Sequence, residues 1–257
     1  MIIQFLKRLI IFIKRFFRII YCGLIDFKLF TICLKVLIHY INSTLMVNRS
    51  INKKYNFKKK EFINLCNTKL IFNHRDLFTS NISSWLHIFN KFSLFNKRLM
   101  ALEIGSFEGR SSFFLLKNLK KINLTCVDTF KPFHELQKKD EKKFTKIYKN
   151  FKVNTSKYSE RLRVVKSTSS SFFSKNKKNF DLIYVDGSHK YKDVLYDSNE
   201  AFKSLNKDGI IIFDDFLWLY EKNLRKTSTF ALLNFLYENN NNLKILYSNY
   251  QLIIKKN

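Results

Sequence analysis

The sequence predicts an α/β fold built on a mostly parallel sheet, from three observations. Short apolar runs of strand length alternate with segments of helical pattern. The run at residues 99–104 is followed by Gly105, Gly109 and the pattern of a helix start. A second run, residues 122–127, ends in Asp128. Strand, glycine turn, helix and acid-tipped strand in this order are typical of the opening of a nucleotide-binding α/β domain.

The turn from Gly105 to Gly109 is the predicted ligand-binding element. Gly105 lets the chain turn and lets backbone N–H groups approach a ligand, and the N-terminus of the next helix favours polar or anionic groups. Asp128 could accept hydrogen bonds from both hydroxyls of a ribose. The alternative is a plain strand–turn–helix without a ligand. The dinucleotide fingerprint G-x-G-x-x-G is absent, because Phe107 stands at its second glycine.

The rest of the chain supplies further strands and helices of the same fold. We expect strands at 161–165, 180–185 and 210–213, helices at 130–152, 192–205 and 229–238, a turn at Asp208-Gly209, and a closing pair of short strands at 243–247 and 251–254. Ser169 lies in a hydroxyl-rich loop after the third strand and could contact an adenine or ribose. Serines in such a loop could equally cap a helix.

Carboxylates follow the fourth and fifth predicted strands. Asp186 comes after the fourth strand, and Asp214 and Asp215 after the fifth. Ligands bind beyond the carboxyl ends of strands in open α/β sheets, and oxygen ligands suit Mg²⁺. A metal there would lower the pKa of a substrate hydroxyl, and His189 could take its proton. The alternatives are turn-capping aspartates without a metal, and a cofactor or structural hydrogen bond for His189.

Two motifs carry a family resemblance. The pattern E-x-G-x-x-x-G, from Glu103 through Gly105 to Gly109, resembles motif I of class I S-adenosylmethionine-dependent methyltransferases. Asp186 with the Asp214-Asp215 pair resembles the metal-dependent O-methyltransferases, such as catechol O-methyltransferase and the macrolide- and aminocoumarin-sugar O-methyltransferases. The strings YVDGSHKY and IIFDD also resemble a broad bacterial methyltransferase family. The resemblance covers roughly residues 98–220 and departs from catechol O-methyltransferase at His189, where that enzyme has Lys.

The resemblance implies a Rossmann-like class I methyltransferase fold: a mostly parallel seven-stranded sheet with a C-terminal antiparallel hairpin, here with an N-terminal helical extension. It implies S-adenosylmethionine as cofactor, with Mg²⁺ as a candidate metal. The implied cofactor contacts are Glu103, Gly105, Ser106, Gly109, Asp128, Ser169 and Asp186. The implied metal ligands are Asp186, Asp214 and Asp215, and the implied catalytic residues are His189 and Asp186. The expected reaction moves a methyl group to a hydroxyl oxygen of a small molecule or saccharide.

The first 21 residues form a predicted amphipathic helix with a basic side. At about 100° per residue, one stripe of the helix gathers the polar residues, with Ile11 as the exception; they are Gln4, Lys7, Arg8, Lys14, Arg15 and Arg18. The charges interrupt every window of the ~18–20 residues needed to span a bilayer. The pattern favours a helix lying in the interface of an anionic membrane, basic side toward the headgroups. Packing on protein and a true span are the alternatives.

Composition leaves several questions open. The net charge of +27 suits nucleic acid or anionic lipid, or it reflects a composition rich in Lys throughout the chain. The four cysteines lack C-x-x-C spacing and read as buried thiols of a reducing compartment. Residues 61–72 and 81–92 are expected as short helices of a cap, in which Trp85 and His87 line the cofactor pocket or merely pack.

We therefore expect a membrane-associating segment at residues 1–45, a helical cap or linker at 46–97 and a methyltransferase domain at 98–257. The expected place is the cytoplasm, peripheral on the cytoplasmic face of a membrane, where a lipid-linked saccharide is one fitting acceptor. The rivals are an RNA methyltransferase that uses the positive charge, an NAD-dependent oxidoreductase, which Phe107 disfavours, and a non-catalytic membrane-associated protein of the same fold. The sequence does not predict an oligomeric state.

Overall fold

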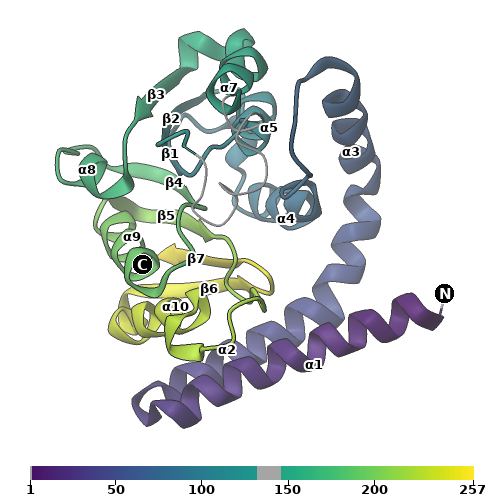
Figure 1. Ribbon diagram of the computed structural model, residues 1–257, viewed down its shortest axis with the longest axis vertical. Helices are drawn as coiled ribbons and strands as arrows, with labels where there is room; N and C mark the ends of the chain where they lie inside the picture. The colour runs from purple at the N-terminus through teal and green to yellow at the C-terminus, as the bar shows by residue number, and fades with distance from the viewer. Residues whose placement is uncertain (1, 132–145) are drawn as a thin grey trace. The chain divides into compact units, whose positions relative to one another are not determined.

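The computed structural model of the protein describes residues 2–131 and 146–257 (Figure 1). Its chain divides into two compact units. The first unit joins Met1–Val47 to Ser188–Asn257, and the second is Asn48–Gly187. The predicted segments 1–45, 46–97 and 98–257 were defined by their expected roles rather than by compactness, and they stay a prediction.

The second unit holds the parallel part of the sheet. Its strands and helices, in chain order, are α3 (Asn48–Lys69), α4 (Ile82–Lys91), β1 (Leu99–Ile104), α5 (Arg110–Asn118), β2 (Ile122–Asp128), α7 (Ile147–Thr155), β3 (Leu162–Lys166), α8 (Ser169–Phe173) and β4 (Phe180–Val185). Short 3-10 helices lie at Thr79–Asn81, Leu94–Asn96 and Ser156–Arg161. β1 pairs in parallel with β2 and β4, and β2 pairs in parallel with β3. β1 and β4 are buried almost throughout, as expected for parallel strands covered on both faces.

An aromatic cluster joins the helices of this unit to the sheet. Trp85 of α4 is fully buried and contacts Phe78, Phe114 of α5 and Tyr184 of β4 edge to face, with ring centroids 4.8–6.0 Å apart. Such edge-to-face aromatic pairs add to the stabilisation that burial provides. Of the two expectations for Trp85, its contacts are those of cap packing. His87 is partly buried, and burial lowers the pKa of its imidazole.

The first unit combines the N-terminal helices with the antiparallel end of the sheet. Its elements are α1 (Ile2–Ile25), α2 (Phe30–Asn42), a π-helical turn (Ser43–Val47), α9 (Tyr191–Lys203), β5 (Leu205–Phe213), α10 (Ser228–Glu238), β6 (Leu243–Ser248) and β7 (Leu252–Lys256), with 3-10 helices at Phe27–Leu29, Leu224–Lys226 and Asn240–Asn242. β7 pairs antiparallel with both β5 and β6. Figure 1 shows α1 and α2 side by side, and α2 also packs against β6 and α10.

The predicted fold class is confirmed. The seven strands follow the order β3-β2-β1-β4-β5-β7-β6, with antiparallel pairing at the C-terminal end and a helical extension at the N-terminus. All four cysteines are free and buried, as expected. The part of the predicted helix at 130–152 that includes Pro132 lies outside the described residues, and α7 begins at Ile147.

Several element boundaries differ from the sequence prediction by a few residues, and two differences are larger. The helix expected at 61–72 is the end of a longer helix, α3, which begins at Asn48 and ends at Lys69. Most of its lysines are exposed, while Ile51, Tyr55, Phe62 and Cys66 are buried at helical spacing. The basic run that precedes residue 61 is therefore part of the helix. The turn expected at Asp208-Gly209 lies inside β5, where Asp208 adopts φ 63° without reversing the chain.

The basic side of α1 is also divided differently from the prediction. Lys7, Arg8 and Lys14 are exposed, whereas Arg18 is only 8% exposed and, like Arg15, bonds to the protein's own backbone. Large apolar side chains of α1 are exposed as well, among them Leu9, Ile11 and Ile25. Most of them form a stripe made up of Ile3, Leu6, Ile10, Ile13, Phe17, Tyr21 and Leu24. Their spacing of three and four residues places them on one face of the helix. We call this set the α1 stripe.

One helical stretch of the described residues, Phe27–Lys69, is long and apolar enough to cross a membrane by length and composition. The core helix of a globular domain meets the same criterion. Within the first unit, the α2 part of this stretch buries Ile32, Cys33, Val36 and Tyr40. Leu34 and Ile38 of the same helix are exposed, so α2 is buried on one side only.

Candidate functional site

The loop between β1 and α5 is a compact turn of five residues. Gly105, Phe107 and Gly109 all adopt positive φ, at 86°, 47° and 83°. Gly109 is the N-cap of α5, and its N–H donates to Ser106 O at 2.8 Å. Two glycines allow this sharp turn because they adopt left-handed conformations without a steric penalty. Phe107 carries the cost of that conformation for a bulky residue.

Gly105 is required by the approach of β4 to this loop. A Cβ built on Gly105 would lie 1.9 Å from the carbonyl oxygen of Asp186. The N–H of Asp186 in turn donates to Ile104 O at 2.8 Å, and the N–H of Gly105 donates to Val127 O at 2.9 Å. The carboxyl ends of β1, β2 and β4 therefore meet, as the sequence predicted. The absence of a side chain at Gly105 serves this backbone contact as well as any ligand.

Asp128 at the end of β2 fastens the loop. Its Oδ2 accepts from the N–H groups of Ser106 and Phe107, both at 2.8 Å, and its Oδ1 accepts from the N–H of Phe130 at 2.6 Å. Burial raises the pKa of Asp128, and the three N–H donors oppose that rise. A carboxylate has about four acceptor positions, so three bonds leave one on Oδ1. The residue can hold one further hydroxyl without releasing the loop.

Glu103 lies beneath this loop. It is fully buried, and its Oε2 accepts from the hydroxyl of Ser112 and from Cys126 Sγ at 3.2 Å. Burial is the main cause that raises the pKa of Glu103, and it raises that of Cys126 as well. Ser106, also predicted as a cofactor contact, is 2% exposed. Their side chains support the turn from within, and a cofactor role for them stays a prediction.

Glu108 is a residue of this loop that the sequence analysis missed. Its carboxylate is buried and accepts from the N–H groups of Asn73 and His74 and from Asn150 Nδ2 at 2.8–3.2 Å. The Nδ1 atom of His74 lies 3.1 Å from Glu108 Oε2. Glu108 thereby ties the segment after α3 and the helix α7 to the loop. The signal available in the sequence was a carboxylate inside the predicted turn, directly before Gly109.

Ser169 is the first residue of α8. Thr168 is the N-cap, and its Oγ1 accepts from the N–H of Ser171 at 3.2 Å. Ser169 itself is partly exposed. The capping role considered for this loop therefore belongs to Thr168, and the contact of Ser169 with an adenine or ribose stays a prediction.

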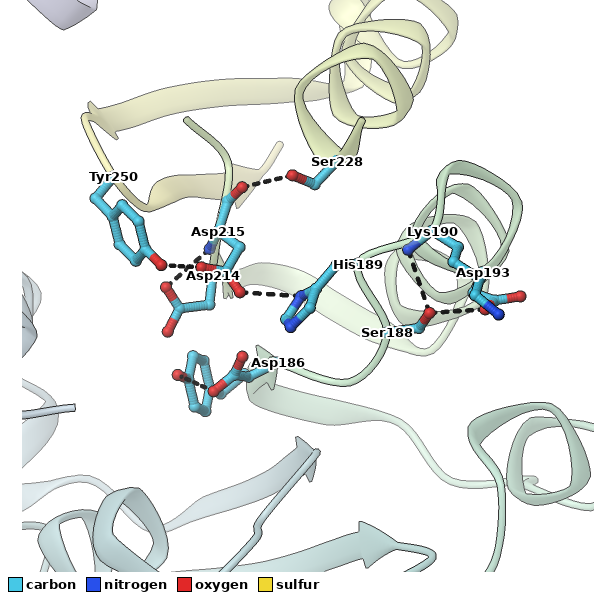
Figure 2. Close-up of polar contacts among 10 residues, drawn as sticks. Asp186, Ser188, His189, Lys190, Asp193, Asp214, Asp215, Ser228 and Tyr250 are labelled. Carbon is cyan, nitrogen blue, oxygen red and sulfur yellow. Dashed lines mark hydrogen bonds and ion pairs between the residues drawn. The ribbon is translucent and has the colours of Figure 1, made fainter. Parts of the chain in front are cut away.

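His189 and Asp215 form the polar centre of the first unit (Figure 2). The Nδ1 atom of His189 lies 3.0 Å from Asp215 Oδ2, and Oδ1 of the same carboxylate accepts from the hydroxyl of Tyr250. The imidazole is 36% exposed, and the Asp215 carboxylate is 13% exposed. Because a carboxylate only accepts, Nδ1 carries the hydrogen, and Nε2 is then the basic nitrogen.

Local hydrogen bonds fix the backbone on both sides of this pair. Ser188 Oγ donates to Asp193 Oδ2 at 2.7 Å and accepts from the N–H of Lys190 at 3.3 Å, so the residues around His189 are attached to the start of α9. On the other side, Ser228 Oγ at the start of α10 donates to Asp215 O at 2.5 Å. These bonds attach the segments around His189 and Asp215 to the first turns of α9 and α10.

The two aspartates after β5 have different surroundings. Asp214 Oδ1 accepts from the N–H of Asp215 at 2.8 Å, and Asp215 adopts φ 52°. Both oxygens of Asp215 have protein partners. Among residues 2–131 and 146–257, no three His, Cys, Asp or Glu residues gather so that they could hold a metal ion. Asp186, whose Oδ2 accepts from Tyr184 Oη at 2.8 Å, belongs to the other unit.

Comparison with known proteins also points to a methyltransferase. A family described as a methyltransferase domain matches residues 102–216. An uncharacterised protein of Acanthamoeba polyphaga mimivirus is 31% identical over 121 residues, which are 46% of this chain and 52% of that protein. The chain thus spans about half the length of this relative.

Two solved structures show the fold. The first is a methyltransferase of Podospora anserina bound to S-adenosylhomocysteine. Its TM-score is 0.51 at 14% identity, and the match covers 77% of this chain and 87% of the Podospora chain. The second is the methyltransferase MycE of mycinamycin biosynthesis, in complex with Mg, S-adenosylhomocysteine and mycinamycin VI. Its TM-score is 0.52 at 17% identity, and the match covers 77% of this chain and 54% of the MycE chain. At these identities the likeness concerns the fold alone.

Proposed function

We propose that the protein transfers a methyl group from S-adenosylmethionine to a hydroxyl oxygen of a small molecule or saccharide, because residues 102–216 match a family described as a methyltransferase domain and the sheet has the predicted order. The observation that carries the proposal is the loop from Gly105 to Gly109, closed on Asp128 by two backbone N–H groups. When bound, S-adenosylmethionine supplies a methyl group on a positively charged sulfur.

The residues around this loop fit such a cofactor. The positive φ angles of Gly105 and Gly109 form the close turn that a nucleotide-like ligand needs. The remaining acceptor position on Asp128 Oδ1 is suited to one ribose hydroxyl. We propose Glu103, Ser106, Ser169 and Asp186 as further contacts, with the buried Glu103 acting through the loop that it supports.

His189 is the proposed general base. Asp215 holds the Nδ1 side of the imidazole, so Nε2 can take the proton that the acceptor hydroxyl loses. The hydroxyl of Tyr250, which donates to the Asp215 carboxylate, and the hydroxyl of Ser228, which donates to the Asp215 carbonyl oxygen, keep Asp215 in place. The protein's tasks are to orient the acceptor and to remove its proton, because methyl transfer is a single displacement that depends on alignment.

The metal prediction fits this arrangement less well. Asp215 already uses its two oxygens on His189 and Tyr250, so it would have to exchange these partners to bind Mg²⁺. The proposed reaction therefore has no step through a metal. Mg²⁺ at Asp186, Asp214 and Asp215 stays a prediction; loss of turnover in a chelator and its recovery with Mg²⁺ would establish it.

We propose an anionic membrane surface, on its cytoplasmic side, as the place of the reaction. The α1 stripe exposes seven large apolar side chains, and Lys7, Arg8 and Lys14 are exposed on the same helix. Apolar side chains enter the acyl boundary of a bilayer, while basic residues are attracted to anionic headgroups. The net charge of +27 acts in the same direction. A lipid-linked saccharide is the acceptor that suits this position.

The test is to follow the methyl group. Purified protein is incubated with methyl-labelled S-adenosylmethionine and, separately, with a lipid extract, a water-soluble small-molecule extract and total RNA. Label in an alkali-stable ether of a lipid-linked or soluble acceptor supports the proposal. Label only in nuclease-sensitive material would establish the RNA methyltransferase instead. The His189→Gln variant controls for uncatalysed methylation.

A further inference from the structure

Helix α1 holds the segment that follows the Asp214-Asp215 pair. Arg18 Nη1 donates to Trp218 O and Arg18 Nη2 to Glu221 O, both at 2.8 Å. Arg15 Nε donates to Leu217 O at 3.2 Å. The two guanidinium groups thus bind carbonyl groups within one stretch of five residues, which we call the 217–221 segment.

Burying two guanidinium groups is an unfavourable way to attach a helix whose only role is packing. Arg18 is 8% exposed, and burial lowers the pKa of both Arg18 and Arg15. Burying a guanidinium costs free energy that its hydrogen bonds must offset, and apolar side chains of similar size pack at least as well. The two arginines instead supply directional donors, and an Arg fork fixes the groups that it binds in orientation as well as in position.

The 217–221 segment carries part of the surroundings of His189. The rings of Trp218 and His189 are 4.8 Å apart, and Trp218 stacks on Tyr220 with centroids 5.3 Å apart. The N–H of Trp218 also donates to Asp215 O at 3.2 Å. A displacement of this segment would therefore move the indole that lies against the imidazole.

Arg15 reaches the same imidazole by a second route. Its Nη1 donates to Asn249 Oδ1 at 3.1 Å, and its guanidinium lies 5.2 Å above the ring of Tyr250. The Tyr250 hydroxyl donates to Asp215, which is paired with His189. The aromatic and the acidic neighbours of His189 are thus both in contact with residues that α1 binds.

We propose that Arg15 and Arg18 are positioning residues, which hold the 217–221 segment and Tyr250 so that Trp218 and Asp215 keep the imidazole of His189 in place. The importance of this for catalysis rests on the proposed role of His189 as general base. The exposed α1 stripe occupies a different face of the same helix from the two arginines. The helix that meets the membrane is then also the helix that positions the base.

The test is the NMR signal of the His189 imidazole in the full chain without cofactor or acceptor. Its carbon-bound ring protons are assigned with His189→Gln, and Trp218→Leu gives their position without the indole. In Arg18→Ala the signal is expected to move toward its position in Trp218→Leu. Arg8→Ala removes an exposed arginine from the same helix and is expected to leave the signal in place. Arg18→Lys, which keeps the charge but loses the fork, is expected to shift it in the same direction by less.

A His189 signal that stays at its wild-type position in folded Arg18→Ala would overturn the proposal and leave Arg18 as a packing contact. If Arg18→Ala does not fold, Arg18→Lys decides in the same way. Calorimetry with S-adenosylmethionine separates this result from the proposed function. Arg18→Ala should bind the cofactor like the wild type, because Gly105 and Asp128 belong to the other unit. If the wild type does not bind S-adenosylmethionine, the methyltransferase proposal is wrong, while the NMR result on Arg18 still holds.

Discussion

The Nδ1 atom of His189 lies 3.0 Å from Asp215 Oδ2, and the two residues belong to the same compact unit. The chain brings them together from opposite ends of α9 and β5, which lie between them in the sequence. A carboxylate in this position fixes the ring orientation and stabilises the imidazolium that forms when the base takes a proton.

Replacement of Asp215 by Asn should therefore slow methyl transfer. Asn keeps the shape of the side chain but cannot stabilise a protonated imidazole, so we expect kcat to fall by about 10²–10⁴, the range of general acid–base catalysis. Formation of S-adenosylhomocysteine with the acceptor found by methyl labelling measures it. Glu238→Gln, at an exposed position of α10, is the control. Unchanged turnover in Asp215→Asn would remove the His189–Asp215 pair from the mechanism.

The two loop glycines should differ in their tolerance of a methyl group. Both have positive φ, which costs about 1–3 kcal/mol for a residue with a Cβ. At Gly105 the Cβ would overlap the Asp186 backbone at 1.9 Å, whereas at Gly109 it would meet side-chain atoms of Phe151 and Thr155 at 3.0 and 3.2 Å. Gly105→Ala should lose clearly more unfolding free energy in urea than Gly109→Ala. Equal losses would contradict the backbone contact between β1 and β4.

The buried carboxyl group of Glu103 should make stability depend on pH. Burial raises its pKa above 4.5 in the folded state, so the folded protein favours the protonated form. Its contribution to stability is fully present below about pH 4.5 and is lost as the pH rises through the folded-state pKa. Glu103→Gln does not titrate. As the pH rises, the unfolding free energy of Glu103→Gln should therefore increase relative to that of the wild type, by about 1.4 kcal/mol for each unit by which the pKa of Glu103 is raised. Parallel curves in urea titrations across this range would contradict the burial argument.

The α1 stripe should bind anionic vesicles. A variant with Ile10, Ile13 and Phe17 changed to Ser should sediment less with phosphatidylcholine–phosphatidylserine vesicles than the wild type, and pure phosphatidylcholine should bind either protein weakly. These positions are exposed, so their replacement should leave the thermal unfolding midpoint nearly unchanged. A dimer that forms without lipid and is lost in the same variant would assign the stripe to a second copy of the chain.

The sequence predicted those features that depend on local patterns. β4 was placed to the residue and the end of β1 to within one residue, because an apolar run followed by Gly or Asp marks a buried strand and its end. Gly105, Asp128 and Asp186 were expected at one edge of the sheet, and the structure places them there.

The features that the sequence did not predict depend on contacts between distant segments. Periodicity placed Arg15 and Arg18 on one side of α1 but could not show that this side faces the 217–221 segment, about 200 residues away. In the same way, nothing near Asp215 indicates that Tyr250, 35 residues later, occupies one of its oxygens. The helix expected at 61–72 begins earlier, at Asn48, and its lysine-rich first half is recognised as helical only once the buried side chains between the lysines are known.

The measurement that tests the central claim most directly is a calorimetric titration of the purified protein with S-adenosylmethionine, beside Asp128→Ala and Glu160→Ala. Asp128 holds the Ser106 and Phe107 N–H groups and offers the remaining acceptor position to the ribose, while Glu160 is exposed in the same unit. We predict binding by the wild type and by Glu160→Ala, and its loss in Asp128→Ala. Well-folded wild type that binds no S-adenosylmethionine, or that binds NAD instead, would contradict the account.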